Sequence, residues 1–324
     1  MAGNPGLLKQ LSDVAGTKAK ALLKAVFRAA VSIGLLLWLF RRVDVGSVFS
    51  SFGAIAPGVW CSAFALYLLS QVLSSIRWSI LARALGFSGR MITYLKFYFV
   101  GMFFSLFLPS AIGGDVLKTF FLARGEKKKL KAGYSILCDR LVGLWAMFLL
   151  GAGAVIISPQ ELPRRFGAML LITACAMTFG VLGMPLVKKM LAIFFPVLSE
   201  RLDSMLVYWS HPRVIASALT LSLMLQFCGM YAVYLLGHGL GLPCTPEFYF
   251  SSFPLVALLT ILPISLSGLG IREGGFVYFM GLKHVPPEKA ITLSLGFFAV
   301  QAAAALLGGI GFLAGVHREG PKDA

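Results

Sequence analysis

Long apolar runs separated by short polar loops make up most of the chain. Six of them, at roughly 25–40, 57–76, 134–157, 167–187, 214–236 and 288–315, are close to or above the ~20 residues that a spanning helix needs. This pattern predicts an all-α polytopic membrane protein with about six spanning helices. It also predicts an amphipathic surface helix within 188–213, where lysines and aromatic residues mix.

Two further apolar stretches, 94–123 and 247–282, are interrupted near their middles. The interruptions are 108–115 (LPSAIGGD) and 262–273 (LPISLSGLGIRE). Proline removes a helical donor and clashes with the preceding turn, and glycine weakens the remaining helix, so neither stretch is expected to be one continuous helix. We expect two re-entrant helical hairpins, each with a short helix that restarts after its break.

Composition supports a lipid environment for most of the chain. Of its 324 residues, 58% are hydrophobic and only 13% charged, and the mean hydropathy is +0.85. This apolar content is too high for a soluble domain of this length. The net charge of +16 comes from basic residues between the apolar runs, which favours anionic lipid headgroups over nucleic acid as partners.

The basic residues also suggest an orientation. The loops on both sides of 94–123 are basic, with Arg83 and Arg90 before it and Lys127 and Lys128 after it, so both of its ends are expected on the cytoplasmic side. We expect a cytoplasmic amphipathic segment at 1–24, one membrane domain at 25–315 and a cytoplasmic tail at 316–324. The expected location is the cell inner membrane, with both termini cytoplasmic.

The two halves resemble each other. Leu85-Gly86 precedes the first break, and Leu240-Gly241 precedes the second at nearly the same spacing. Repeat one would cover about 57–157 and repeat two about 214–315, in opposite membrane orientations. Paired interrupted segments in inverted halves are typical of a transport site near the bilayer midplane.

Six charged residues remain inside or beside the apolar segments once the loops are assigned. Three are basic and three acidic, which suggests that they neutralise one another instead of facing lipid. They are Lys118, Arg140, Arg272, Asp115, Asp139 and Glu273.

Three motifs in this order resemble the lysylphosphatidylglycerol synthase transmembrane, or flippase-like, family. They are 103–115 (FFSLFLPSAIGGD), 138–143 (CDRLVG) and 262–274 (LPISLSGLGIREG). The resemblance implies a membrane domain that moves a lipid with a polar headgroup between leaflets. The cargo would be a phospholipid, aminoacylated in the synthases, or a polyprenyl-phosphate-linked lipid. The synthases carry a soluble aminoacyl-transferase domain after the membrane part and this chain stops, so a separate lipid synthase is a candidate partner.

The candidate binding residues gather at the two breaks and at the start of the helix after the first one. Basic side chains and half-helix starts suit a phosphate, carboxylates suit a cationic headgroup, hydroxyls add contacts, and glycines allow close approach. The set is Ser110, Gly113, Gly114, Asp115, Lys118, Asp139, Arg140, Ser265, Ser267, Gly270, Arg272 and Glu273. Neither a metal site nor a cofactor is expected, because the histidines and the five cysteines lack ligand spacing.

Plainer interpretations stay open for several of these residues. Asp139 and Arg140 could be an ion pair that holds a helix to the first hairpin, and Asp115 could be only an N-cap. Arg77, beside Trp78 at an expected helix end, is interpreted as an interfacial anchor.

Three functional classes fit the sequence. A lipid translocase is favoured by the paired breaks. A membrane enzyme would need Asp115 or Glu273 as a general base, and a scaffold for a separate synthase would tolerate substitutions at the breaks.

Overall fold

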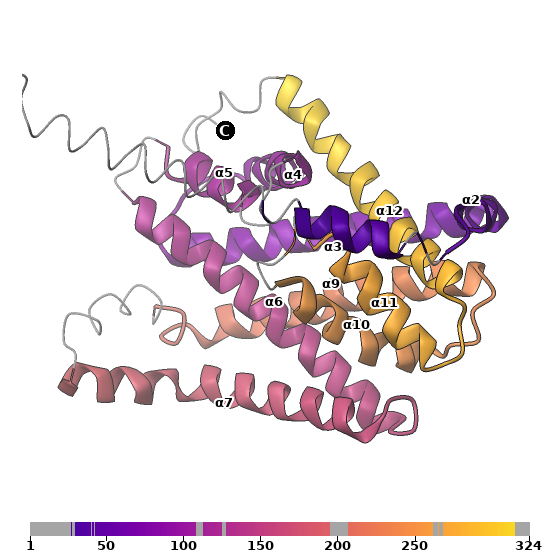
Figure 1. Ribbon diagram of the computed structural model, residues 1–324. Coiled ribbons are helices and arrows are strands. Elements are labelled where there is room, and N and C mark those ends of the chain that lie inside the picture. The colour runs from indigo at the N-terminus through magenta and orange to yellow at the C-terminus, as the bar shows by residue number, and fades with distance from the viewer. Residues whose placement is uncertain are drawn as a thin grey trace, which may run out of the picture.

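The described part of the protein is entirely helical. The computed structural model describes residues 27, 30–39, 41, 43–107, 113–124, 128–194, 207–261, 265 and 268–314, and no strand occurs among them. Figure 1 shows the helices as one bundle, with α7 along its outer side. The expected all-α membrane class is therefore confirmed for these residues.

Five helices are long and apolar enough to cross a membrane. At 1.5 Å per residue, their 27 to 31 residues reach about 40 Å or more, which exceeds the ~30 Å hydrocarbon core. Proline occupies the first turn of three of them, where its missing N–H costs nothing. The five are α3 (Pro57–Ala84), α6 (Lys129–Ile157), α7 (Arg164–Phe194), α9 (Pro212–Gly239) and α12 (Pro287–Leu313).

The sixth expected span, at 25–40, has a shorter counterpart. Within it the structure describes a continuous helix over Ala30–Leu39, which alone is too short to cross a bilayer. The expected surface helix at 188–213 is wrong in its first part, because α7 continues through Phe194. Residues 195–206 lie outside the described residues, and 207–210 form a turn.

Both interrupted stretches consist of two helices that pack against each other. The first contains α4 (Met91–Phe107) and α5 (Gly113–Leu122), and the second contains α10 (Pro246–Ile261) and α11 (Ile271–Gly281). A short helix therefore restarts after each break, as the sequence predicts. Gly268 and Gly270 have φ values of 80° and 82°, a conformation that favours glycine.

Helices α3 and α9 form the most extensive helix pair in the bundle. Each has 28 residues and ends before a Leu-Gly pair whose glycine has positive φ, 86° at Gly86 and 66° at Gly241. When the two helix sequences are aligned without a gap, identical residues occur at matching positions: Pro57 and Pro212, Ala63 and Ala218, Gln71 and Gln226, Leu81 and Leu236.

The remaining helices pack in matching ways around α3 and α9. Helix α4 packs on α12 while α10 packs on α6, and α5 packs on α6 while α11 packs on α12. Glycines allow the closest approaches: a Cβ on Gly308 would overlap the Phe99 carbonyl, and one on Gly151 would lie 2.9 Å from Pro254 Cγ. The α4–α5 pair and the α10–α11 pair thus each pack against both α6 and α12.

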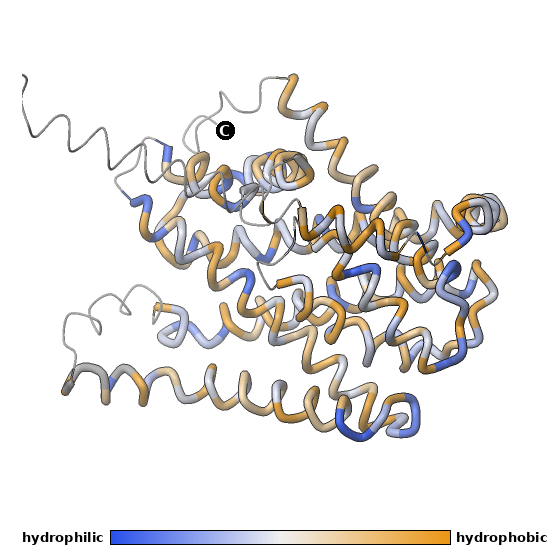
Figure 2. The backbone as a smooth tube through the Cα atoms, in the orientation of Figure 1, coloured by the Kyte–Doolittle hydropathy of each residue, from blue (hydrophilic) through white to orange (hydrophobic). Residues whose placement is uncertain are grey.

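Helix α7 is the most peripheral of the long helices. Figure 2 shows it as apolar along most of its length, with hydrophilic residues at its start. Phe179, Leu182 and Ile172 are all exposed. Because these side chains have no protein cover, lipid is their natural environment.

Candidate functional site

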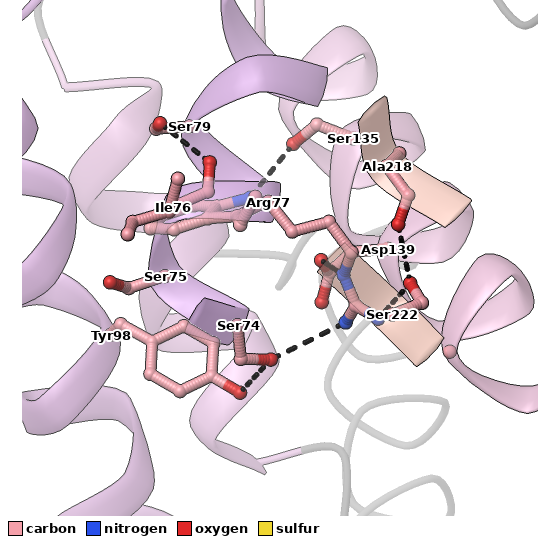
Figure 3. Close-up of polar contacts among 12 residues, drawn as sticks. Ser74, Ser75, Ile76, Arg77, Ser79, Tyr98, Ser135, Asp139, Ala218 and Ser222 are labelled. Carbon is pink, nitrogen blue, oxygen red and sulfur yellow. Dashed lines mark hydrogen bonds and ion pairs between the residues drawn. The ribbon is translucent and has the colours of Figure 1, made fainter. Parts of the chain in front are cut away.

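A buried ion pair joins three long helices in the interior of the bundle. Arg77 Nε of α3 lies 2.7 Å from Asp139 Oδ1 of α6, and Arg77 Nη1 donates to Ser222 Oγ of α9 at 2.7 Å (Figure 3). The two charged side chains are only 5% and 10% exposed. The interpretation of Arg77 as an interfacial anchor is therefore wrong, since its guanidinium points inward to a carboxylate.

The sequence contained a signal for this inward arginine. Ser70 and Ser74 lie seven and three residues before Arg77, on the same face of α3, and both are buried. A polar stripe that runs along one helix face indicates a polar partner within the bundle, whereas an interfacial anchor would stand at the end of an apolar face. Asp139, which the sequence paired with Arg140, instead pairs with Arg77.

The first break leads directly into a second group of charges. Asp115 is the third residue of α5 and is buried, in the first turn where a carboxylate is favoured by the helix dipole. Lys118 Nζ lies 3.4 Å from Asp115 Oδ1, and Arg140 Nε of α6 donates to Asp115 Oδ2. Asp115 therefore holds two basic groups, one from its own helix and one from α6.

Tyr98 of α4 links these charges to the interior pair. Lys118 Nζ lies 3.9 Å from the centre of the Tyr98 ring, a cation–π distance, and the Tyr98 hydroxyl donates to Ser74 Oγ at 2.9 Å. Ser74 in turn accepts a bond from Arg77 Nη2 at 3.4 Å. Four helices thus contribute to one polar cluster, which we call the first-break cluster: Arg77, Asp139, Tyr98, Asp115, Lys118 and Arg140.

Glycine 114 brings α5 against α4 at this point. A Cβ there would overlap both Ser105 Oγ and the Gly101 carbonyl oxygen. This close approach places Lys118 beside Tyr98. Gly113 forms the start of α5, as the sequence predicts.

The second break contains a smaller and more closed cluster. Glu273, also the third residue of its helix, is fully buried and accepts from the Gly270 backbone N–H at 2.7 Å. Arg272 Nη2 lies 2.6 Å from Glu273 Oε1, and Ser294 Oγ of α12 donates to the same oxygen at 3.1 Å. Arg272 also lies over the Phe298 ring. Each charge at this break thus has its counter-charge, and the start of α11 is capped by its own carboxylate.

The remaining predicted residues are only partly placed. Ser265 is buried, and its hydroxyl has no hydrogen-bond partner within the described part of the chain. Ser110 and Ser267 lie outside the described residues, as do the prolines of both breaks. No grouping of histidine, cysteine and carboxylate side chains that could hold a metal occurs among the described residues.

The two breaks differ in their charge balance. In the first-break cluster three basic residues, Arg77, Lys118 and Arg140, accompany two carboxylates, and the Arg140 side chain is 49% exposed. At the second break one arginine accompanies one glutamate, and both are largely covered. Among the described residues, the first-break cluster therefore has more basic groups than carboxylates, and its Arg140 guanidinium is partly accessible.

Comparison with known protein families identifies the chain. The family model described as "Lysylphosphatidylglycerol synthase TM region" matches residues 25–309, which is nearly all of the membrane part. None of the curated proteins compared with the chain is similar enough to match it. The matched range contains the three motifs at 103–115, 138–143 and 262–274. The chain belongs to the lysylphosphatidylglycerol synthase transmembrane-region family.

Proposed function

We propose that this membrane protein is a lipid translocase that moves a phosphate-containing headgroup between leaflets through the first-break cluster. The observation that carries the proposal is the pairing of Lys118 and Arg140 on one carboxylate, Asp115. Two basic groups that gather on one carboxylate attract an anion, so a lipid phosphate would find basic partners there. An arginine fork also suits phosphate oxygens in two-point contact.

The helix arrangement supports a transporter. We infer that α3–α6 and α9–α12 are two inverted repeats and that each helix pair at a break is a re-entrant hairpin. The matching contacts of the two halves and the shared residues of α3 and α9 favour this inference. In such proteins the interrupted segments contain the substrate site.

The two breaks would then have different roles. Lys118 and Arg140 contact the headgroup phosphate, while Asp115 orients both and would receive a cationic group if the headgroup carries one. Arg272, Glu273 and Gly270 form a mostly internal contact set that caps α11 and joins it to Ser294 of α12. The lipid tails stay in the bilayer while the headgroup passes along the polar cluster. In this proposal the protein transports the lipid and does not change it chemically.

Location and partners complete the proposal. The protein lies in the inner membrane with both termini in the cytoplasm, as the basic loops favour. Its cargo is a phospholipid or a polyprenyl-phosphate-linked lipid, and a separate synthase supplies it.

Reconstitution tests the proposal. Liposomes with purified protein would contain trace fluorescent phosphatidylglycerol or, in parallel, fluorescent monoglucosyl diacylglycerol, which has no phosphate. An impermeant reductant that bleaches the outer leaflet should then bleach the phosphate lipid beyond its outer-leaflet fraction, and the phosphate-free lipid much less. Equal bleaching of both lipids, or none beyond protein-free liposomes, would contradict the proposal. Chemical turnover of the phospholipid in detergent would favour a membrane enzyme instead.

A further inference from the structure

A cavity of about 240 Å³ lies between α3, α6, α7, α9 and the 207–210 turn, on the face of α6 away from Arg140. Its walls are almost entirely apolar and include Leu81, Cys138, Trp145, Met177 and Ala218. It is separate from the first-break cluster, although Leu81 and Ala218 lie one helical turn from Arg77 and Ser222. Its chemistry therefore differs from that of the proposed headgroup site.

The indole and phenol groups that border this cavity are engaged in hydrogen bonds elsewhere. Trp145 Nε1 donates to Thr178 Oγ1 at 2.9 Å, and the Tyr208 hydroxyl donates to the Leu81 carbonyl at 3.1 Å. Trp209 Nε1 donates to the Val181 carbonyl at 2.9 Å. The side chains thus present their apolar faces to the cavity. An apolar space of this size excludes water and accepts an apolar guest.

The cavity is open toward the bilayer. Gly180 of α7 and Leu141 of α6 both line it and are both exposed. A Cβ on Gly180 would meet no atom within 4 Å. Since the outer face of α7 is covered by lipid, an alkyl chain reaches the cavity from the side, past Gly180.

The charges around this end of the bundle select the lipid's headgroup. The end of α3, the starts of α6 and α9 and the end of α7 lie together on the left of Figure 1. Within the described residues 79–96, 128–138, 177–194 and 207–221, no carboxylate occurs. The basic residues there include Arg83, Arg90, Lys128, Lys129, Lys131, Lys189 and Arg213. These basic residues attract an anionic headgroup.

We propose that this cavity is a binding site for one acyl chain of an anionic phospholipid whose headgroup lies at the basic residues of this end of the bundle. Lipid binding here does not require that the protein move lipid between leaflets, because the cavity residues are distinct from those of the first-break cluster. The turn at 207–210 forms its floor: Tyr208 binds the end of α3 and Trp209 binds α7. Bound lipid would therefore fill the space that this turn and α7 enclose.

The two tryptophans in the wall, Trp145 and Trp209, provide a direct measurement. Protein would be reconstituted in vesicles of unbrominated phosphatidylcholine. One series would contain increasing fractions of brominated phosphatidylglycerol, and the other increasing fractions of brominated phosphatidylcholine. Bromine quenches tryptophan on contact. We expect half-maximal quenching at a mole fraction of brominated phosphatidylglycerol about five-fold lower than that of brominated phosphatidylcholine, which corresponds to about one basic contact.

A cavity-filling variant and its control locate the quenching. Gly180→Leu places a side chain in the cavity and should abolish the preference for phosphatidylglycerol. Gly153→Leu, on α6 outside the cavity, also meets no atom within 4 Å and should retain the preference. Equal quenching by both lipids in the unmodified protein, or an unchanged preference in Gly180→Leu, would overturn the proposal. The comparison of the two lipids in the unmodified protein needs no variant. It therefore tests the proposal even if Gly180→Leu does not fold.

Discussion

Arg77 and Asp139 lie 62 positions apart in the sequence, and their side chains form a 2.7 Å ion pair that fixes α3 against α6 inside the bundle. A Cβ added at Gly143, one turn after Asp139, would lie 3.0 Å from Arg77 Nη1. The glycine therefore provides the space for the guanidinium. The pair therefore depends on a charge, a counter-charge and a gap in one helix surface.

Removal of one partner from this ion pair should lower the free energy of unfolding more than removal of both. Arg77→Met leaves Asp139 buried without its counter-charge, and we expect a loss of about 3–5 kcal/mol in the free energy of unfolding. Arg77→Met with Asp139→Leu should recover most of this loss. Reversible unfolding in mixed SDS and non-ionic micelles measures both. If the double variant were less stable than either single variant, the pair would not act as a charge-compensating unit.

Gly114 should tolerate no side chain, because α4 and α5 meet there. Gly114→Ala would force Ser105 and the Gly101 carbonyl apart, at a cost of about 1–3 kcal/mol, and would displace Asp115 and Lys118. Gly133→Ala is the matched control, since its Cβ meets no atom within 4 Å. It should be neutral or stabilise α6 by up to ~1 kcal/mol through helix propensity. The same unfolding measurement compares them, and equal stabilities would contradict the close packing of α5.

Trp209 and Pro185 should be coupled. Pro185 lies within α7 and has no N–H for the carbonyl four residues before it, Val181, which accepts from the Trp209 indole instead. Trp209→Phe should therefore cost about 1 kcal/mol in the Pro185 background. In Pro185→Ala, where a backbone N–H returns, the same substitution should cost less. A double-mutant cycle on unfolding measures this coupling, and strictly additive effects would contradict it.

The Tyr208 hydroxyl should hold the end of α3 over a wide pH range. Burial raises the pKa of its phenol above the usual range, so the hydroxyl keeps the proton that it donates to the Leu81 carbonyl. A raised pKa favours the folded state until the pH passes the ordinary tyrosine pKa, and stability is lost only above it. The stability difference between the unmodified protein and Tyr208→Phe should thus be constant from pH 6 to pH 9. A difference that changed within this range would show that Tyr208 titrates there.

The sequence predicted local features better than the partners of charged residues. The breaks and the helices that restart after them followed from proline and glycine within apolar stretches. Asp115 and Glu273 are each the third residue of such a helix. The membrane class followed from the lengths of the apolar runs and from composition. These features depend on residues that are close in the sequence, so the local sequence is enough to predict them.

The charge partners could not be predicted in this way. Arg77 finds Asp139 and Ser222 only because α3, α6 and α9 cross at one place, and this crossing depends on packing across the whole bundle. Asp139 and Arg140 are neighbours in sequence but point to different partners, because adjacent residues of a helix differ in direction by about 100°. The polar stripe of serines on α3 was the available signal.

Arg140 should contact the lipid phosphate during translocation, and a comparison of two variants in reconstituted liposomes measures this. Arg140→Gln leaves Asp115 paired with Lys118 and should slow movement of fluorescent phosphatidylglycerol about 10-fold or more, the effect of one lost charged hydrogen bond. Arg164→Gln, at the exposed start of α7, is the control and should move lipid at the unmodified rate. If Arg140→Gln and Arg164→Gln moved the lipid equally fast, the first-break cluster would not be the headgroup site.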